Sequence, residues 1–382
     1  QALGYRFNAA YEDLNPYIKN TEGHRKLFAL AMDWRLTPDS RLEWEIERSE
    51  RQQMGVNAYS LLANATDLDG YSRTVTQILK VRDPADSAAP VALIDPTLAG
   101  QRINGSTGLR GTVADTNLEF WTLEIAPLGA AGDSAAWQLL ARGTQPMDGV
   151  LAQLDAGAYR RGFYQLRLVA QDMAGRRAES QTDIELAAAP QASRYVRLAS
   201  DFQWSLGGHT LDFMRRYDVL DAPSSASFGH GWRLGFADLT VQTNAPVTGA
   251  DASGVYSPLR EGSRAYVRTP DGQTVGFTFA PQQVKGNGYS YFMPSWVADD
   301  GVNWTLESAP LQLQRAAGRF YSLVDGSVYN PASLQDEPAQ YTLVSSDGTR
   351  YTIAAASGVT GVTYADGTHW TVSDSGIVGP DN

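Results

Sequence analysis

Residues 164–172 read Tyr-Gln-Leu-Arg-Leu-Val-Ala-Gln-Asp, and this stretch decides the fold class of the chain. Alternate positions of an extended strand point to the same side, so its apolar positions share one face. That face consists of Tyr164, Leu166, Leu168 and Ala170. Asp172 and Gly175 then supply turn residues that close the strand. The stretch therefore predicts a β-strand with one inward face.

A second strand with the same alternation comes earlier in the chain. Trp121, Leu123 and Ile125 form its inward face. Short strands separated by turns continue through residues 91–189, and strands at this spacing in about 100 residues are typical of a β-sandwich. We expect the two inward faces to meet in the core of one sandwich.

The composition extends this expectation to the whole chain. The 382 residues include 36 Gly and 18 Pro, with Val, Thr, Tyr and Trp spread throughout, which favours an all-β fold. A net charge of −11 without a basic stripe argues against a nucleic-acid partner. Cysteine is absent, which excludes disulfides, thiolate metal sites and a cysteine nucleophile.

The sequence also bears on membranes and export. No apolar run approaches the ~18 residues of a membrane helix, so no membrane span is predicted. No signal peptide is visible at the first residue, Gln1, and we expect the chain to be an internal piece of a longer protein.

Residues 190–382 carry Asp-Gly pairs between segments rich in Tyr, Thr and Val. The pairs are Asp271-Gly272, Asp347-Gly348 and Asp366-Gly367. Such pairs favour tight hairpin turns because glycine readily adopts positive φ. This half of the chain is therefore predicted to be a series of antiparallel hairpins.

The first part of the chain has the pattern of one hairpin with an apolar and a charged face. The apolar positions are Phe28, Leu30, Met32 and Trp34, then Leu42, Trp44 and Ile46. Residues 37–40 (Thr-Pro-Asp-Ser) are the predicted turn. This alternation fits a half-buried soluble strand and also an outer-membrane barrel strand. Residues 83–90 are a predicted linker, and residues 187–190 are a second, shorter one.

Residues 91–189 resemble the bacterial Ig-like repeats that lie upstream of rearrangement-hotspot (Rhs) cores. The resemblance rests on residues 111–115 (Gly-Thr-Val-Ala-Asp), 118–125 and 164–172. Residues 63–70 (Ala-Asn-Ala-Thr-Asp-Leu-Asp-Gly) repeat the closing pattern. Residues 64–90 are therefore expected to be the truncated tail of another copy, followed by a linker.

Residues 190–382 resemble the segment that enters the shell of Rhs/YD-repeat proteins. The motifs that carry this resemblance are residues 215–218 (Arg-Arg-Tyr-Asp), 228–234 (Phe-Gly-His-Gly-Trp-Arg-Leu), 262–267 (Gly-Ser-Arg-Ala-Tyr-Val), 329–332 (Tyr-Asn-Pro-Ala) and the Asp-Gly turns. His230 departs from the family, where an aromatic residue such as Tyr is expected. The resemblance implies a hollow β-cage that wraps a C-terminal toxin or effector until delivery. The Tyr-Asp repeats do not occur in this chain, and no residue matches the self-cleavage aspartates of the family.

Residues 1–63 resemble early barrel strands of TonB-dependent siderophore receptors. The similar stretches are residues 4–12, 30–38, 42–47 and 59–62. The plug and the energy-coupling box are missing, so no transport is expected from this segment. A seam between two unrelated coding sequences is predicted near residues 56–64.

These resemblances divide the chain into four expected parts. They are a receptor-like β-hairpin fragment (1–63), a truncated Ig-like tail and linker (64–90), an Ig-like β-sandwich (91–189) and the N-terminal region of an Rhs/YD-repeat shell (190–382). The implied function is that of a structural part of a secreted or bacterial cell-surface protein. The implied partners are the remainder of the shell and the enclosed effector, or a cell-surface or secretion-system protein. An Ig-like adhesion module and a fragment of a TonB-dependent receptor are the alternatives.

The sequence predicts no enzyme and no cofactor. A nucleophile elbow, a phosphate loop, a dinucleotide fingerprint and a zincin helix are all absent, so no catalytic, cofactor-binding or metal-ligating residue is assigned. His230 is interpreted as a packed turn residue rather than a buried switch or ligand. Asp83 and Asp86 are interpreted as solvated turn carboxylates rather than calcium ligands. Residues 215–217 are interpreted as solvated or stacked at a strand end rather than as an anion or partner site. Most of the nine tryptophans are expected in cores.

Overall fold

The computed structural model describes most of the chain. The described residues are 2–14, 23–37, 40–53, 60–66, 72–78, 82–129, 136–189, 194–222, 225–226, 228–246, 248–253, 255–286, 288–333, 340–354, 357–373 and 375–380. Over these residues the predicted all-β fold is confirmed, since strands and a few short 3₁₀ turns are the regular elements. In the same residues, no helix has both the length and the apolar character needed to cross a membrane.

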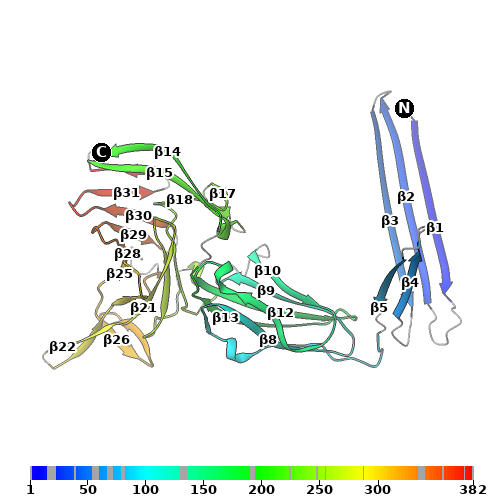
Figure 1. The fold of residues 1–382 in the computed structure, drawn as a ribbon, viewed down its shortest axis with the longest axis horizontal. Coiled ribbons are helices and arrows are strands. Elements are labelled where there is room, and N and C mark those ends of the chain that lie inside the picture. The colour runs from blue at the N-terminus through cyan, green and yellow to red at the C-terminus, as the bar shows by residue number, and fades with distance from the viewer. Residues whose placement is uncertain are drawn as a thin grey trace.

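The N-terminal sheet consists of three long strands, and a separate hairpin follows it. The strands are β1 (Ala2–Leu14), β2 (Gly23–Thr37) and β3 (Ser40–Gln53) in the order β1-β2-β3, then β4 (Ser60–Thr66) paired with β5 (Ser72–Ile78). The predicted hairpin is present as β2 paired with β3, in a register that places Trp34 opposite Leu42 and Leu30 opposite Ile46. Figure 1 shows these five strands standing apart from the other sheets.

The apolar face of the N-terminal sheet is partly open to solvent where its side chains are described, since Leu30 and Met32 are half-buried and other positions are exposed. Phe7 and Phe28 meet edge to face at 5.0 Å, yet they are 55% and 45% exposed. Ile46 on β3 is 55% exposed. The expected half-buried face is therefore not covered at these positions. The middle of the predicted turn at 37–40, residues 56–59 of the predicted seam and residues 67–70 lie outside the described residues.

Residues 91–186 form a sandwich of two sheets. One sheet has the order β10-β9-β12-β13-β7 and the other β11-β8-β6. The strands are β6 (Val91–Ile94), β7 (Arg102–Ile103), β8 (Ser106–Ala114), β9 (Leu118–Pro127), β10 (Gln138–Gly143), β11 (Met147–Asp155), β12 (Gly162–Asp172) and β13 (Arg177–Leu186), with 3₁₀ turns η1 (Pro96–Leu98) and η3 (Ala156–Ala158). All described pairings are antiparallel except β7 with β13, which is parallel. A three-stranded sheet facing a sheet built around β9, β12 and β13 is the Ig-like arrangement.

The two predicted inward faces lie side by side in one sheet, and both point into the sandwich core. Leu166 and Leu168 on β12 are fully buried, and Leu123 on β9 is 1% exposed. Full burial of each such side chain stabilises the fold by about 1.5–3 kcal/mol. The predicted inward faces are confirmed for these strands, except that Tyr164 is half-buried.

The C-terminal region consists of several antiparallel sheets (Figure 1). Their orders are β14-β15-β18, β16-β17, β19-β20-β21-β24, β22-β23-β26-β27 and β25-β28-β29-β30-β31-β32. The first strands are β14 (Val196–Leu206), β15 (His209–Asp218), β16 (Ser225–Ala226), β17 (Gly229–His230), β18 (Trp232–Leu234), β19 (Val241–Thr243), β20 (Arg264–Arg268) and β21 (Thr274–Phe279), with 3₁₀ turns η4 (Val219–Asp221) and η5 (Asp251–Ser253). The later strands are β22 (Gln282–Lys285), β23 (Ser290–Met293), β24 (Trp296–Ala298), β25 (Thr305–Ser308), β26 (Leu313–Ala316), β27 (Arg319–Ser322), β28 (Gln340–Val344), β29 (Arg350–Ala354), β30 (Gly358–Thr363), β31 (His369–Ser373) and β32 (Gly376–Val378).

The predicted Asp-Gly turns join neighbouring strands in this region. Gly272 lies between β20 and β21, Gly348 between β28 and β29, and Gly367 between β30 and β31. All three glycines have positive φ, which explains why a residue without a side chain occupies each position. A core of aromatic and aliphatic side chains, including Phe277, Phe320 and others, lies beneath these hairpins.

Candidate functional site

The sandwich and the C-terminal sheets meet in a buried polar joint. The Tyr266 hydroxyl on β20 donates to Glu185 Oε1 on β13 at 2.7 Å. Burial and this hydrogen bond raise the pKa of Tyr266 to about 12. Arg264, beside it on β20, places its guanidinium Nη1 and Nη2 2.6 and 2.7 Å from the two carboxylate oxygens of Asp299. The sandwich is therefore joined to the next sheets by a packed contact that lies just before the predicted linker at 187–190.

A neutral side chain adds to the same joint. The Gln242 amide on β19 accepts from the Phe163 N–H at 2.9 Å. It donates to the carbonyls of Phe163 and Leu128 at 2.9 and 3.2 Å. The ring of Phe163 packs against Tyr266 with 5.3 Å between ring centroids. Backbone groups at the end of the sandwich are thus satisfied by a side chain from the next sheet.

Two aspartates beside this joint collect an excess of arginines. Asp218 ends β15, is fully buried and lies within 4 Å of Arg160, Arg194 and Arg216. Asp221 in η4 is 4% exposed and lies within 4 Å of Arg160, Arg233 and Arg268. We call these seven residues the arginine cluster. Its two carboxylates face five guanidinium groups.

The pKa values in the arginine cluster follow this imbalance. Burial alone would raise the pKa of Asp221, but the Arg268 hydrogen bond and the Arg160 charge outweigh it and lower the pKa to about 2. For Arg160, burial is likewise outweighed by Asp221 and Asp218, and its pKa rises. For Arg216, burial lowers the pKa, and the positive charges of Arg194 and Arg160 add to that effect against Asp218. At Arg216, burial together with the neighbouring guanidinium groups therefore outweighs the attraction of Asp218 and Asp271.

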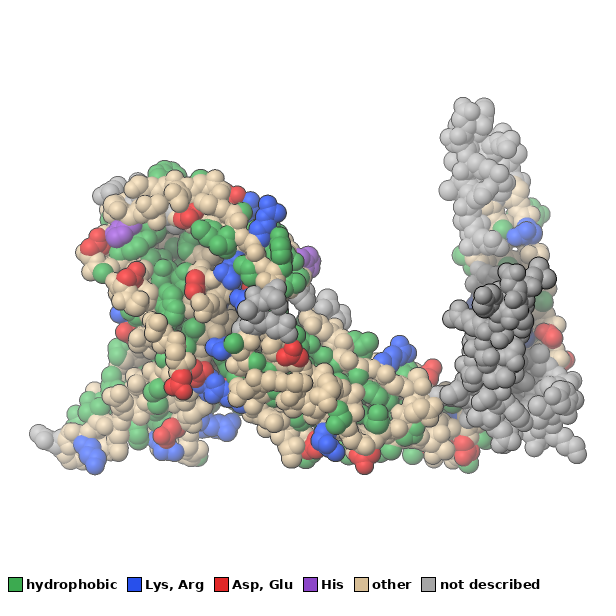
Figure 2. Space-filling model, in the orientation of Figure 1, with side chains coloured by type: hydrophobic (Ala, Val, Ile, Leu, Met, Phe, Trp, Pro, Cys, Tyr) green, Lys and Arg blue, Asp and Glu red, His purple; other side chains and the backbone are tan. Residues whose placement is uncertain are grey.

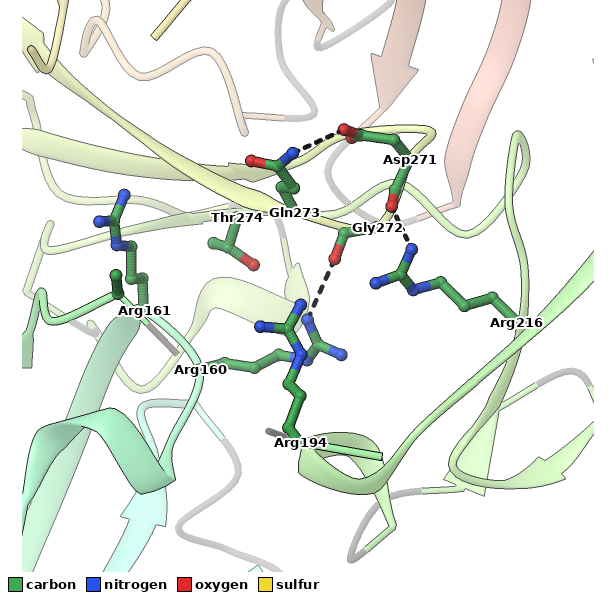
Figure 3. Close-up of a pocket in the computed structure, with 9 residues that line it drawn as sticks. Arg160, Arg161, Arg194, Arg216, Asp271, Gly272, Gln273 and Thr274 are labelled. Atoms are coloured by element: carbon green, nitrogen blue, oxygen red, sulfur yellow. Dashed lines mark hydrogen bonds between the residues drawn. The ribbon is translucent and has the colours of Figure 1, made fainter. Parts of the chain in front are cut away.

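A cavity of about 380 Å³ opens against this cluster, and four arginines line it. Arg160 and Arg161 come from the loop before β12, Arg194 lies just before β14, and Arg216 lies on β15. The opposite wall is the β20–β21 turn, residues 271–274. Figure 3 shows the side chains of Arg160, Arg194 and Arg216 converging on this turn, with Arg161 further along the wall. We call this cavity the arginine pocket.

The predicted Asp-Gly turn forms part of the pocket wall. Arg160 Nη1 donates to the Gly272 carbonyl at 3.3 Å, and Arg216 Nη1 donates to the Asp271 carbonyl. A Cβ at Gly272 would lie 2.5 Å from Arg216 Nε, and its φ of +75° also disfavours other residues. The glycine therefore serves both the hairpin turn and the close approach of Arg216.

A second charged cluster lies at the opposite end of β12. Among the described residues, Asp86, Asp115 and Asp172 are close enough together to hold a metal ion. Asp172 is fully buried, and its Oδ1 accepts from the N–H groups of Ala174 and Arg176. We call the three aspartates with Arg176 the acidic cluster.

A protein cation lies inside the acidic cluster. Arg176 Nε lies 2.5 Å from Asp172 Oδ2, and its Nη2 lies 3.3 Å from Asp86 Oδ2. Asn117 donates to the Asp86 carboxylate at 2.8 Å. Asp86 is therefore not the solvated carboxylate that the sequence indicated, because it is bonded to the sandwich. Asp83 is exposed, and its Oδ1 accepts from Ala85 N–H as a turn residue should.

The structure separates the features weighed in the sequence. Arg215 is stacked as interpreted, lying over Phe228 and Trp232 at 5.7 and 5.5 Å from the ring centroids and paired with Asp201. Arg216, its neighbour, enters the arginine pocket instead. His230 is exposed, so the interpretation of a packed turn residue is wrong, as is that of a buried switch.

The remaining aromatic and histidine positions are only partly as expected. Trp121, Trp296 and Trp370 are buried, whereas Trp204 is 65% exposed. His209 on β15 stacks on Tyr364 and lies edge to face with Trp370 on β31.

Sequence reasoning missed the arginine cluster because its members are far apart in the chain. Arg160 and Asp221 are 61 residues apart, beyond any local periodicity. The usable signals were the arginine pairs at 160–161 and 215–216, each at a strand boundary. Figure 2 shows a column of blue basic side chains between the C-terminal sheets and the sandwich.

Comparisons with known proteins leave the family open. No protein-family model matches the chain, and no curated protein matches it. Among solved structures, the chain is similar to the crystal structure of the protocadherin GammaB4 extracellular domain, at 10% sequence identity and a TM-score of 0.17. That match covers 99% of this chain and 76% of the other. A likeness at this level carries no argument about function.

Proposed function

We propose that the chain is a structural, non-catalytic part of a secreted or surface protein of the Rhs/YD-repeat type. Residues 190–382 would form the opening strands of a β-shell that encloses an effector, and the Ig-like sandwich would be a fixed spacer in front of it. The sheet β25-β28-β29-β30-β31-β32 carries this proposal, because from β29 onward each strand pairs with the one before it in the chain. A sheet that grows in chain order along one edge is the element from which a wound shell can be built.

The joint between the sandwich and the next sheets supports the role of a fixed spacer. Flexible domain boundaries have few contacts crossing them and are rich in exposed polar residues. Here Tyr266, Glu185 and Arg264 are all less than 10% exposed and bonded across the boundary. A joint of this kind holds the spacer at one angle to the shell wall.

Strand β14 supports further sheet growth on the other side. It is an edge strand of the sheet β14-β15-β18 and exposes Leu198, Phe202 and Trp204, each about half or more. Natural proteins usually shorten, charge or cover such an edge because it attracts other strands. Strands from the rest of a shell would cover it.

The test is the complete reading frame and its product. Sequencing the source DNA on both sides of this segment should show many Tyr-Asp repeats followed by a variable C-terminal domain. Electron microscopy of the purified product should then show a closed hollow particle, with its C-terminal domain protected from added protease until the shell is unfolded. A frame without such repeats, or a C-terminal domain cleaved as fast as the isolated domain, would rule the proposal out.

A further inference from the structure

We infer that the arginine pocket is a binding site for a small phosphate-bearing anion. This goes beyond the proposed structural role, which needs the joint but not a ligand. The inference depends on the charge balance, the open hydrogen-bond donors and the shape of the pocket.

The charge balance leaves positive charge directed at the cavity. Arg160, Arg194 and Arg216 all line the pocket, and all three have Asp218 as an ion-pair partner. Asp221 adds negative charge on Arg160, but it is also shared with Arg233 and Arg268. Asp271, on the pocket wall, accepts from Arg216 through its backbone carbonyl, and its carboxylate adds one negative charge near Arg216 against the four arginines of the pocket. Buried guanidinium groups in such excess are stabilised by a bound anion.

Hydrogen-bond donors remain open around the cavity. Within the described residues, the buried Nε atoms of Arg194 and Arg216 have no hydrogen-bond partner. Arg194 Nε lies 3.3 Å from Asp218 Oδ2 without the alignment of a hydrogen bond. Arg161 uses its Nε on the Ala188 carbonyl and faces the same cavity. Both Nε atoms are out of reach of solvent, so an anion in the cavity would be attracted by the charge of these two guanidinium groups rather than bonded at Nε.

The chemistry of the donors selects phosphate. Guanidinium groups present planar pairs of N–H donors that match two oxygens of one anion, and a tetrahedral phosphate offers such pairs to several arginines together. A monovalent halide has no such geometry. A cavity of about 380 Å³ is at the small end of ligand sites and suits a phosphate ion or a small phosphate ester. The net charge of −11 of the whole chain repels long polyanions, which disfavours a nucleic acid there.

The location gives the ligand a structural effect. Arg160 and Arg161 belong to the sandwich, whereas Arg194, Arg216 and Gly272 belong to the C-terminal region. An anion held by both sets would tie the joint from both sides. Binding should therefore raise the unfolding temperature as well as release heat.

The experiment uses the 382-residue chain and two probes, inorganic phosphate and glycerol 3-phosphate, each against chloride at equal ionic strength. Isothermal titration should show one saturable site per chain, and the unfolding temperature should rise with either probe but not with chloride. Tighter binding of inorganic phosphate would identify a free-ion site, and tighter binding of glycerol 3-phosphate an ester site. Saturable binding of neither probe, or tighter binding of citrate, would overturn the inference.

Variants test the location of the site. Arg194→Gln and, separately, Arg161→Gln should each weaken binding about tenfold, the loss expected for a charge-assisted hydrogen bond of about 1.4 kcal/mol. Arg350→Gln is the matched control, because Arg350 pairs with Glu307 on the surface of β29. It should bind as the unaltered chain does. Equal affinity in all three variants, or the same loss in the control, would place the site elsewhere and overturn the inference.

Discussion

Both ends of strand β12 carry ion pairs between arginine and aspartate, but arginines are in excess at one end and aspartates at the other. Arg160 lies just before the strand in the arginine cluster, where five guanidinium groups face two carboxylates. Asp172 is its last residue, in the acidic cluster, where one arginine lies among three aspartates. At the acidic end, backbone N–H groups and an asparagine amide make up the missing positive partners.

The difference shows which of the two ends has room for a ligand. The acidic cluster closes on itself because a turn can direct several N–H groups at one carboxylate. Arginines have no comparable backbone neutraliser, since a carbonyl carries only a partial negative charge. Unbalanced positive charge therefore remains beside the cavity at the arginine cluster. At the acidic cluster, the negative charge is compensated by hydrogen bonds.

The largest expected effect comes from removing the shared carboxylate of the arginine cluster. Asp221→Asn should lower the free energy of unfolding by about 2–4 kcal/mol, because Arg160, Arg233 and Arg268 then lose a buried counter-charge together. Urea denaturation followed by tryptophan fluorescence measures this. A loss below about 1 kcal/mol would mean that the arginines are balanced by water or by other groups.

The acidic cluster should respond to the loss of its arginine instead. Arg176→Gln should cost about 1.5–3 kcal/mol, the usual net value of hydrogen bonds to charged groups. The control is Arg177→Gln, an exposed neighbour on β13, which should change stability little.

In the unaltered chain, Ca²⁺ should shift the unfolding temperature no more than Mg²⁺, since Arg176 already lies between Asp172 and Asp86. A Ca²⁺-specific rise would contradict this account.

Acid should weaken the arginine cluster over a defined range of pH. The pKa of Asp221 falls from its ordinary 3.8 to about 2, so its contribution is present above pH 4 and is lost as the pH falls towards 2. A shift of this size corresponds to about 2 kcal/mol. Asp172 and Asp299 also have lowered pKa values, so the unaltered chain must be compared with Asp221→Asn. The variant should show a shallower loss of stability between pH 4 and 2, and parallel curves would assign the acid sensitivity to other carboxylates.

The smallest effect has the most informative sign. Arg194→Gln, in buffer without phosphate, should change stability by less than about 0.5 kcal/mol or raise it, because the variant removes one of the excess charges. The same substitution at Arg176 lowers stability by several times as much. If the two variants were equally destabilising, the proposed asymmetry between the ends would be wrong.

What could be predicted from the sequence was local. The alternation around Leu166 and Trp121 identified inward faces because a strand's period is set by the backbone. Asp271-Gly272 identified a turn because positive φ selects glycine. The hairpin that pairs the strand of Trp34 with the strand of Leu42 followed from the same alternation. Each of these properties depends on neighbours within one hairpin.

What could not be predicted depends on which surfaces meet. Phe28 and Ile46 show as regular an alternation as Leu166, yet they are exposed, since a pattern marks a face without saying what covers it. Arg216 and Arg215 are adjacent, and only the fold decides that one is stacked on the surface while the other enters the pocket. The pairing of Arg160 with Asp221 likewise requires the sandwich to be placed against β15 and η4 first.

The Gln242 amide gives the joint a property that its charged groups lack. It bonds to Phe163 as the backbone of a neighbouring strand would. Its oxygen accepts from the Phe163 N–H, and its NH₂ group donates to the Phe163 carbonyl. Because the amide carries no charge and does not titrate, neither pH nor salt concentration weakens these hydrogen bonds. As acid or salt weakens the surrounding ion pairs, the two units should therefore separate more easily but not slide along each other, because the alignment is set by an uncharged group. The alignment of the sandwich with the next sheets and the strength of the joint between them are therefore set by different residues.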